Sequence, residues 1–306
     1  MTMKNPSKTI LFFGTDSFSA ISLNELIEKG FTIGAVITKP DMHKGRGQIV
    51  IAPEVKIIAQ QNDIPVWQPK SVSDITDDVI NLTKSTGDKP LGVLVSYGRI
   101  IPQKIINLFS PGIINVHPSL LPLYRGPSPI ESAILNGETE TGVTIMQLSK
   151  EMDAGPIYSQ APFKLKDTET TPELEQKLGE LGAQELTRVL PAIISGALQP
   201  IKQNNQVATY CKLLKKSDGL LDAATLASIT AEQAERFVRA YRVFPKTTVK
   251  IGDYKIVITR AHVTSKGHTP LDIACSDGRF LAIDELISPS GRTMNAKAFL
   301  NGHPNI

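Results

Sequence analysis

Residues 113–126 read Ile-Ile-Asn-Val-His-Pro-Ser-Leu-Leu-Pro-Leu-Tyr-Arg-Gly, a short apolar run that ends on two polar side chains and passes directly into a loop. Because side chains alternate along a strand, Asn115 and His117 project to the same face near its C-terminal end. Open α/β sheets bind their ligands outside that end of their strands. The pattern therefore predicts an amide and an imidazole side by side at a ligand-binding edge.

A third polar residue follows the next predicted strand. Residues 141–148 form a strand-like run, and the loop 149–155 after it could bring Asp153 to the same edge. An Asn, a His and an Asp can together polarise a carbonyl group, stabilise an oxyanion and transfer a proton. Each residue alone is more typical of a structural role, since an Asp before Ala-Gly commonly forms a turn. The combination favours a catalytic site made of Asn115, His117 and Asp153.

Together these residues resemble the site of the folate-dependent formyltransferases, a family with an Asn, a His and an Asp on a parallel sheet and a Ser-Leu-Leu-Pro loop beside the folate. The similarity spans nearly the whole chain and is greatest to the members that act on methionyl initiator tRNA. The chain departs from the family pattern at two places. Asp16 stands where the family usually has Pro, and Phe244-Pro245-Lys246 replaces its Pro-Gly. The other segments that carry the resemblance are 11–15, 39–47, 95–98, 140–146 and 299–302.

The resemblance implies a folate substrate, 10-formyltetrahydrofolate, as the formyl donor. It places the pterin against the backbone around Arg99, Ile100 and Ile101. The loop of Ser119, Leu120, Leu121 and Pro122 would flank the site and exclude water from the reaction. Core packing is the alternative role of the two leucines, and both roles are compatible.

The loop 38–50 is longer than most strand-to-helix connections, and it carries Lys44 followed by Arg46, which lies between two glycines. The resemblance implies that it reaches the acceptor end of the tRNA. We expect Arg46 to make that contact through phosphate charge and base stacking, with Lys44 beside it. A solvated surface loop without a partner is the alternative.

Strands that alternate with helices over the first two thirds of the chain predict a doubly wound, mostly parallel sheet, and the resemblance implies that it is of the formyltransferase type. Ser17 is expected to cap the first helix. We place this catalytic domain at residues 1–196, because the polar segment 197–207 breaks with both flanks in composition and is predicted to be a linker.

Residues 208–306 are predicted to form a second, small domain. Four short strand-like segments at 247–251, 254–263, 271–275 and 280–286 are separated by turn sequences such as Gly252-Asp253, which is typical of a small barrel. The family resemblance implies an OB-like tRNA-binding domain here.

The charge is divided unevenly, although the net charge of the 306 residues is only +3. Residues 201–306 hold 15 basic and 9 acidic side chains, whereas residues 1–200 hold 18 and 21. Such an excess suits contact with a polyanion. We therefore predict tRNA contacts at Lys212, Lys215 and Lys216, with a solvated basic surface as the alternative. Arg236, Arg239 and Arg242 share a helix face by spacing, for which a solvated face is the default expectation.

The composition, 41% hydrophobic and 21% charged, is ordinary for a globular protein. Residues 1–8 have no signal-like apolar core, and no run approaches 18 apolar residues, so we expect a cytoplasmic protein without a membrane partner. The two cysteines are expected to be reduced and non-catalytic, and no spacing predicts a metal site. We also expect a monomer.

Several other chemistries lack their motifs: there is no Gly-x-Gly-x-x-Gly, no phosphate loop ending in Gly-Lys-Ser/Thr and no Gly-x-Ser-x-Gly. The family resemblance implies formyl transfer from 10-formyltetrahydrofolate to the α-amino group of methionyl initiator tRNA. One alternative is a formyltransferase that acts on an amino sugar nucleotide, which needs no basic barrel. The other is an RNA-binding protein with an inactive formyltransferase fold, which the complete Asn, His and Asp set disfavours.

Overall fold

The computed structural model describes residues 8–44 and 49–303. Contacts within the chain divide it into two compact units that interleave along the sequence. The predicted domain limits at residues 196 and 208 come from composition and stay a prediction. The first unit comprises residues 1–125, 141–163 and 176–210, and the second comprises 126–140, 164–175 and 211–306.

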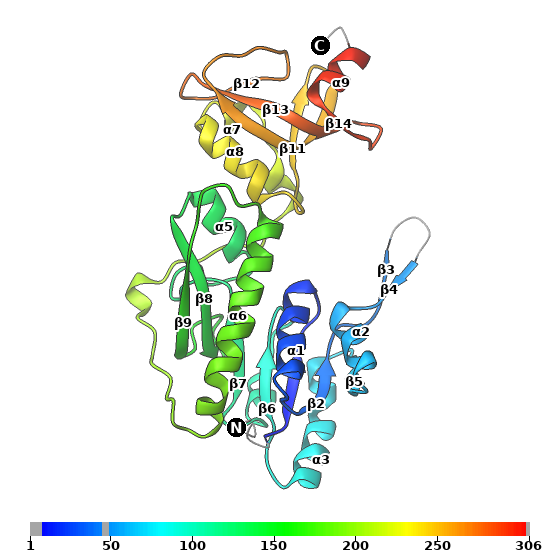
Figure 1. The fold of residues 1–306 in the computed structure, drawn as a ribbon, viewed down its shortest axis with the longest axis vertical. Helices are drawn as coiled ribbons and strands as arrows, with labels where there is room; N and C mark the ends of the chain where they lie inside the picture. The colour runs from blue at the N-terminus through cyan, green and yellow to red at the C-terminus, as the bar shows by residue number, and fades with distance from the viewer. Residues whose placement is uncertain (1–7, 45–48, 304–306) are drawn as a thin grey trace. The chain divides into compact units, whose positions relative to one another are not determined.

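The first unit is built on a seven-stranded sheet of order β5-β2-β1-β6-β7-β8-β9 (Figure 1). The five strands from β5 to β7 are parallel, and β8 runs antiparallel to β7. The predicted mostly parallel sheet is therefore confirmed. The strands are β1 Ile10–Phe13, β2 Ile33–Ile37, β5 Val66–Trp67, β6 Leu91–Leu94, β7 Ile113–His117, β8 Glu140–Gln147 and β9 Ile157–Lys164.

Helices flank this sheet, and a two-stranded hairpin adjoins it. All four residues of β1 are fully buried, as expected for a parallel strand covered on both faces. Phe13 packs edge-to-face on Tyr97 and Phe109, with ring centroids 5.6 and 5.8 Å away. The helices are α1 Ser17–Glu28, α2 Glu54–Gln61, η1 Val72–Ile75, α3 Thr76–Thr86, α4 Gln103–Ile106, α6 Thr171–Ile194 and η2 Asn205–Val207, and the hairpin strands are β3 Met42–Lys44 and β4 Ile49–Ile51.

The cap of α1 is Asp16, so the prediction that Ser17 caps this helix was wrong by one residue. The Asp16 carboxylate accepts a hydrogen bond from the Ser19 amide at 3.2 Å. It also accepts one from the Ser96 hydroxyl. Asp16, one of the two departures from the family pattern, thus joins the first loop to the segment after β6.

The second unit contains a curled antiparallel sheet of five strands, a half-barrel, which confirms the predicted OB-like architecture (Figure 1). Its predicted strand 271–275 was too long. The Asp272 carboxylate accepts the amides of His268 and Thr269 in a turn, which leaves only two residues to pair. The elements are α5 Pro129–Asn136, η3 Lys216–Gly219, α7 Ala223–Leu226, α8 Ala231–Ala240, β10 Thr247–Ile251, β11 Tyr254–Thr264, β12 Ile273–Ala274, β13 Phe280–Ile287, β14 Thr293–Asn295 and α9 Ala296–Gly302.

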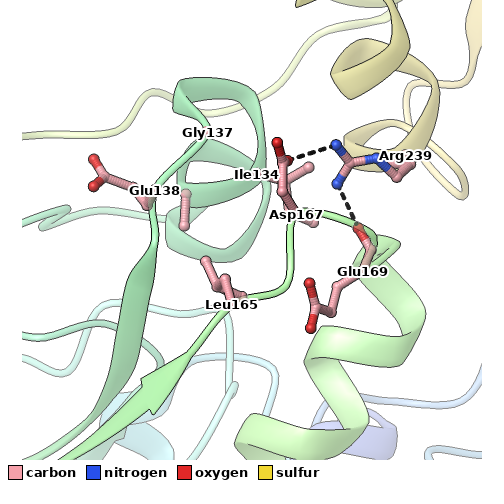
Figure 2. Close-up of a pocket in the computed structure, with 8 residues that line it drawn as sticks. Ile134, Gly137, Glu138, Leu165, Asp167, Glu169 and Arg239 are labelled. Carbon is pink, nitrogen blue, oxygen red and sulfur yellow. Dashed lines mark hydrogen bonds and ion pairs between the residues drawn. The ribbon is translucent and has the colours of Figure 1, made fainter. Parts of the chain in front are cut away.

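Arg239 on α8 is buried, which contradicts the expectation of a solvated arginine face. It donates to the Asp167 carboxylate at 2.8 Å and to the Glu169 carbonyl at 3.1 Å. Figure 2 shows these bonds beside a small cavity that the three residues help to line. Glu235, one turn before it, accepts a further bond at 2.8 Å. Arg236, and Arg239 after it, hold the pKa of the Asp167 carboxyl below its ordinary value. These arginines anchor the 164–175 segment inside the second unit.

The described part of the chain has no helix with both the length and the apolar character needed to cross a bilayer. Cys211 and Cys275 carry thiols, and the Cys211 sulfur accepts a hydrogen bond from the Ser128 amide at 3.3 Å. Within residues 8–44 and 49–303, no three His, Cys, Asp or Glu side chains cluster as metal ligands would.

A candidate active site on strand β7

Asn115 and His117 lie on β7, where the sheet changes from parallel to antiparallel pairing. Asn115 stands between Leu94 of β6 and Met146 of β8, and His117 is opposite Thr144. Both side chains are nearly buried, with 6% and 5% of their surface exposed. Because they are two residues apart on a strand, they share one face of the sheet.

The orientation of the His117 ring follows from a backbone carbonyl. The distance from Nε2 to the Tyr124 carbonyl oxygen is 3.0 Å, and since a carbonyl can only accept, Nε2 carries the proton. Nδ1 lies 3.8 Å from Oδ2 of Asp153. This separation exceeds a direct hydrogen bond and leaves the carboxylate next to the imidazole ring.

Asp153 reaches His117 by a different path from the one the sequence suggested. Because β8 is antiparallel, it ends beside Ile114 at the start of β7, at the opposite edge from His117. The loop after β8 must therefore return along β7. Asp153 has a left-handed backbone, with φ of +49°. At Gly155 the loop passes so close to the end of β8 that a Cβ there would lie 1.8 Å from the Gln147 carbonyl oxygen. Only glycine fits at this position without a shift of the backbone.

Hydrogen bonds to Leu123 and to Thr144 hold the Ser-Leu-Leu-Pro loop in place. The Ser119 hydroxyl donates to the Leu123 carbonyl at 2.6 Å. Thr144 of β8 donates to the Ser119 carbonyl at 2.6 Å and accepts the Leu121 amide at 3.1 Å. Leu121 is buried, whereas Leu120 and Pro122 are partly exposed. Thr144 is not among the residues predicted from the sequence. A polar threonine within an otherwise apolar strand is the signal that could have identified it.

The three predicted folate residues after β6 have different surroundings. The Arg99 guanidinium donates to the carbonyls of Pro69 and Lys70 at 2.9 and 3.0 Å. Ile101 is buried, while Ile100 has 85% of its surface exposed. The Arg99 guanidinium is therefore engaged within the protein, and the pterin contact expected at this backbone stays a prediction.

The predicted tRNA residues fall into three situations. Arg46 and the side chain of Lys44 lie outside the described residues. Lys212 is paired with Asp218 at 2.5 Å, and this pairing is the main cause of the lowered pKa of the Asp218 carboxyl. Lys215 and Lys216 are exposed at the start of η3 in the second unit.

The chain belongs to the formyl transferase family. The model of the formyl transferase domain matches residues 8–190, and that of the formyl transferase C-terminal domain matches residues 214–304. Among curated proteins the chain is 38% identical over 308 residues to the methionyl-tRNA formyltransferase of Chloroflexus aurantiacus, with 96% of each chain covered. It is 41% identical over 236 residues to that of Buchnera aphidicola subsp. Acyrthosiphon pisum, covering 77% of this chain and 73% of the relative.

Two solved structures share the fold. One is HypX from Aquifex aeolicus in complex with tetrahydrofolic acid, with a TM-score of 0.67 and 18% identity, covering 96% of this chain and 47% of that one. The other is an N-formyltransferase from Helicobacter canadensis in complex with folinic acid and dTDP-3-aminofucose, with a TM-score of 0.67 and 19% identity, covering 91% and 99%. At such identities the likeness concerns the fold alone.

Proposed function

We propose that this protein transfers the formyl group of 10-formyltetrahydrofolate to the α-amino group of methionine on initiator tRNA. The observation that carries the chemistry is the buried pair of Asn115 and His117, with Asp153 3.8 Å from the imidazole. The acceptor is supported by the relatives named methionyl-tRNA formyltransferase, whose similarity includes both the sheet and the C-terminal unit.

The reaction forms a bond between the amine nitrogen and the formyl carbon and breaks the bond from that carbon to the folate nitrogen. The formyl oxygen becomes negative in between, and the Asn115 amide and protonated His117 can donate to it through Nδ2 and Nδ1. The amine loses one proton and the folate nitrogen gains one. Asp153 is the group beside His117 that can accept this proton and pass it on.

The substrates would meet at β7 within the first unit. The rigid Ser119–Pro122 loop and the backbone at residues 99–101 are proposed to hold the folate. Lys44, Arg46, Lys212, Lys215 and Lys216 are proposed to contact the tRNA. We also propose that the protein acts in the cytoplasm as a monomer, which light scattering at the 33.2 kDa of the chain would check.

A competition among acceptors tests the function. The purified protein is given 10-formyltetrahydrofolate with charged initiator tRNA, with charged elongator methionine tRNA, or with an amino sugar nucleotide. We expect the initiator tRNA to be formylated fastest. Formylation of the sugar nucleotide alone would replace the proposed acceptor, and no transfer to any acceptor would support the inactive RNA-binding alternative.

A further inference from the structure

Arg125 is a buried arginine next to the candidate site, with 2% of its surface exposed. Its Nε and Nη2 donate to the side-chain oxygen of Gln203 at 3.1 and 2.7 Å. Nη2 also donates to Asn205 at 2.7 Å, and Nη1 to the Tyr210 hydroxyl at 3.3 Å. All three partners belong to residues 203–210, which we call the strap.

Gln203 links this arginine to the loop that carries Asp153. Its Nε2 donates to the carbonyls of Asp153 and Gly155, at 2.8 and 2.7 Å. An arginine can only donate and a carbonyl can only accept, so the orientation of the amide is fixed at both ends. Gln203 therefore joins Arg125 directly to the backbone of Asp153.

The strap also holds the residue that orients His117. The Tyr124 amide donates to the Thr209 hydroxyl at 2.8 Å, and the Arg125 amide donates to the Thr209 carbonyl at 2.9 Å. The carbonyl of Tyr124 is the hydrogen-bond partner of His117 Nε2. The strap therefore contacts the backbone at Tyr124, which orients His117, and the backbone of Asp153 itself.

The segments of Tyr124 and Asp153 each contain an unfavourable backbone conformation. Tyr124 and Asp153 have φ of +58° and +49°, the left-handed region that non-glycine residues rarely adopt. Such a backbone conformation is unfavourable for a residue with a side chain, so it persists only where surrounding contacts impose it. The contacts with the strap are of this kind.

We propose that Arg125 and Gln203 are positioning residues, and that the strap sets the distance between His117 and Asp153. The inference rests on the proposed function for its catalytic consequence. We expect neither Arg125 nor Gln203 to touch a substrate. Their loss should therefore lower kcat and leave the binding of both substrates nearly unchanged.

The variant Gln203→Met keeps the length of the side chain and removes its hydrogen bonds, with Gln199→Met as the matched control on an exposed glutamine. We expect kcat to fall roughly 10- to 100-fold, because small misplacements of reacting groups have costs of that size. KM for folate and acceptor should change less than about twofold. Hydrogen exchange of the peptide spanning 149–156 should become faster in Gln203→Met and not in the control.

A double variant separates positioning from general stability. In the Asp153→Asn background, Gln203→Met should add less than about a twofold loss, because the residue acts through Asp153. A full additive loss, or unchanged kcat and unchanged exchange in the single variant, would overturn the inference. If exchange responds but the native protein formylates no acceptor, then the strap holds the loop as inferred and the proposed function fails.

Discussion

His117 owes its tautomer to a group that does not titrate. The Tyr124 carbonyl requires the proton on Nε2, so Nδ1 is the ring atom left for chemistry beside Asp153. In the neutral ring Nδ1 can accept a proton, and in the protonated ring it can donate to an oxyanion. One residue can therefore serve both stages of a formyl transfer.

Replacing Asn115 or His117 with alanine should each lower the transfer rate by ~10²–10³, the usual cost of removing one oxyanion donor. Single-turnover rates with saturating folate measure the effect. Asn107→Ala, on an exposed asparagine, should leave the rate unchanged. Near-normal turnover in either site variant, with the fold intact by circular dichroism, would remove that residue from the mechanism.

Asp153→Asn should retain the shape of the loop while deleting its charge, so the loss should fall mainly on kcat. Steady-state kinetics at one pH would show this as a lower kcat with little change in KM. A rise in KM with kcat unaffected would make Asp153 a binding residue instead.

At the scale of elements, the loop after β8 depends on Gly155. In Gly155→Ala the new Cβ would meet the Gln147 carbonyl oxygen at 1.8 Å, so the backbone must move and carry Asp153 with it. We expect a lower Tm together with a lower kcat. Gly302→Ala is the control, because no atom lies within 4 Å of its Cβ position. Unchanged thermal melting and kinetics in Gly155→Ala would show that the loop tolerates another path.

The end of α8 should make stability sensitive to strong alkali. Burial, and then the charges of Asp218 and Glu131, raise the pKa of Tyr241 to about 12. The phenol therefore loses its proton in the unfolded chain, near pH 10, before it does so in the folded one, and stability falls between about pH 10 and 12. Chemical denaturation across this range should give a smaller fall for Tyr241→Phe than for the native protein. Equal slopes would mean that the phenol is not the group responsible.

The elements differ in how far the sequence predicts them. Continuous apolar runs and turn residues identify β1, β7 and β10, because the information is local. The Asn115 and His117 pair is local as well, since the two residues share one strand. Gln203 meets Asp153 from 50 residues away and Arg125 from 78, and no periodicity encodes such contacts. The burial of Arg239 depends likewise on Asp167, 72 residues before it.

At the scale of the whole molecule, tRNA binding should depend unequally on the predicted lysines. All three lysines are exposed, but the ammonium group of Lys212 is already paired with Asp218. Lys215→Gln with Lys216→Gln should flatten the dependence of log Kd on log salt by roughly two units, about one for each phosphate contact. Lys212→Gln should do less. Equal salt slopes in all variants would indicate a solvated surface and favour a small-molecule acceptor.

The strap has a consequence for the order in which the enzyme matures. It follows every strand of the seven-stranded sheet in the sequence. During synthesis the ribosome therefore releases Asn115, His117 and Asp153 well before the residues that brace them. A nascent chain that ends before residue 203 would hold the three proposed catalytic side chains without the contacts that we propose set their spacing. Competence would be acquired in the last third of translation.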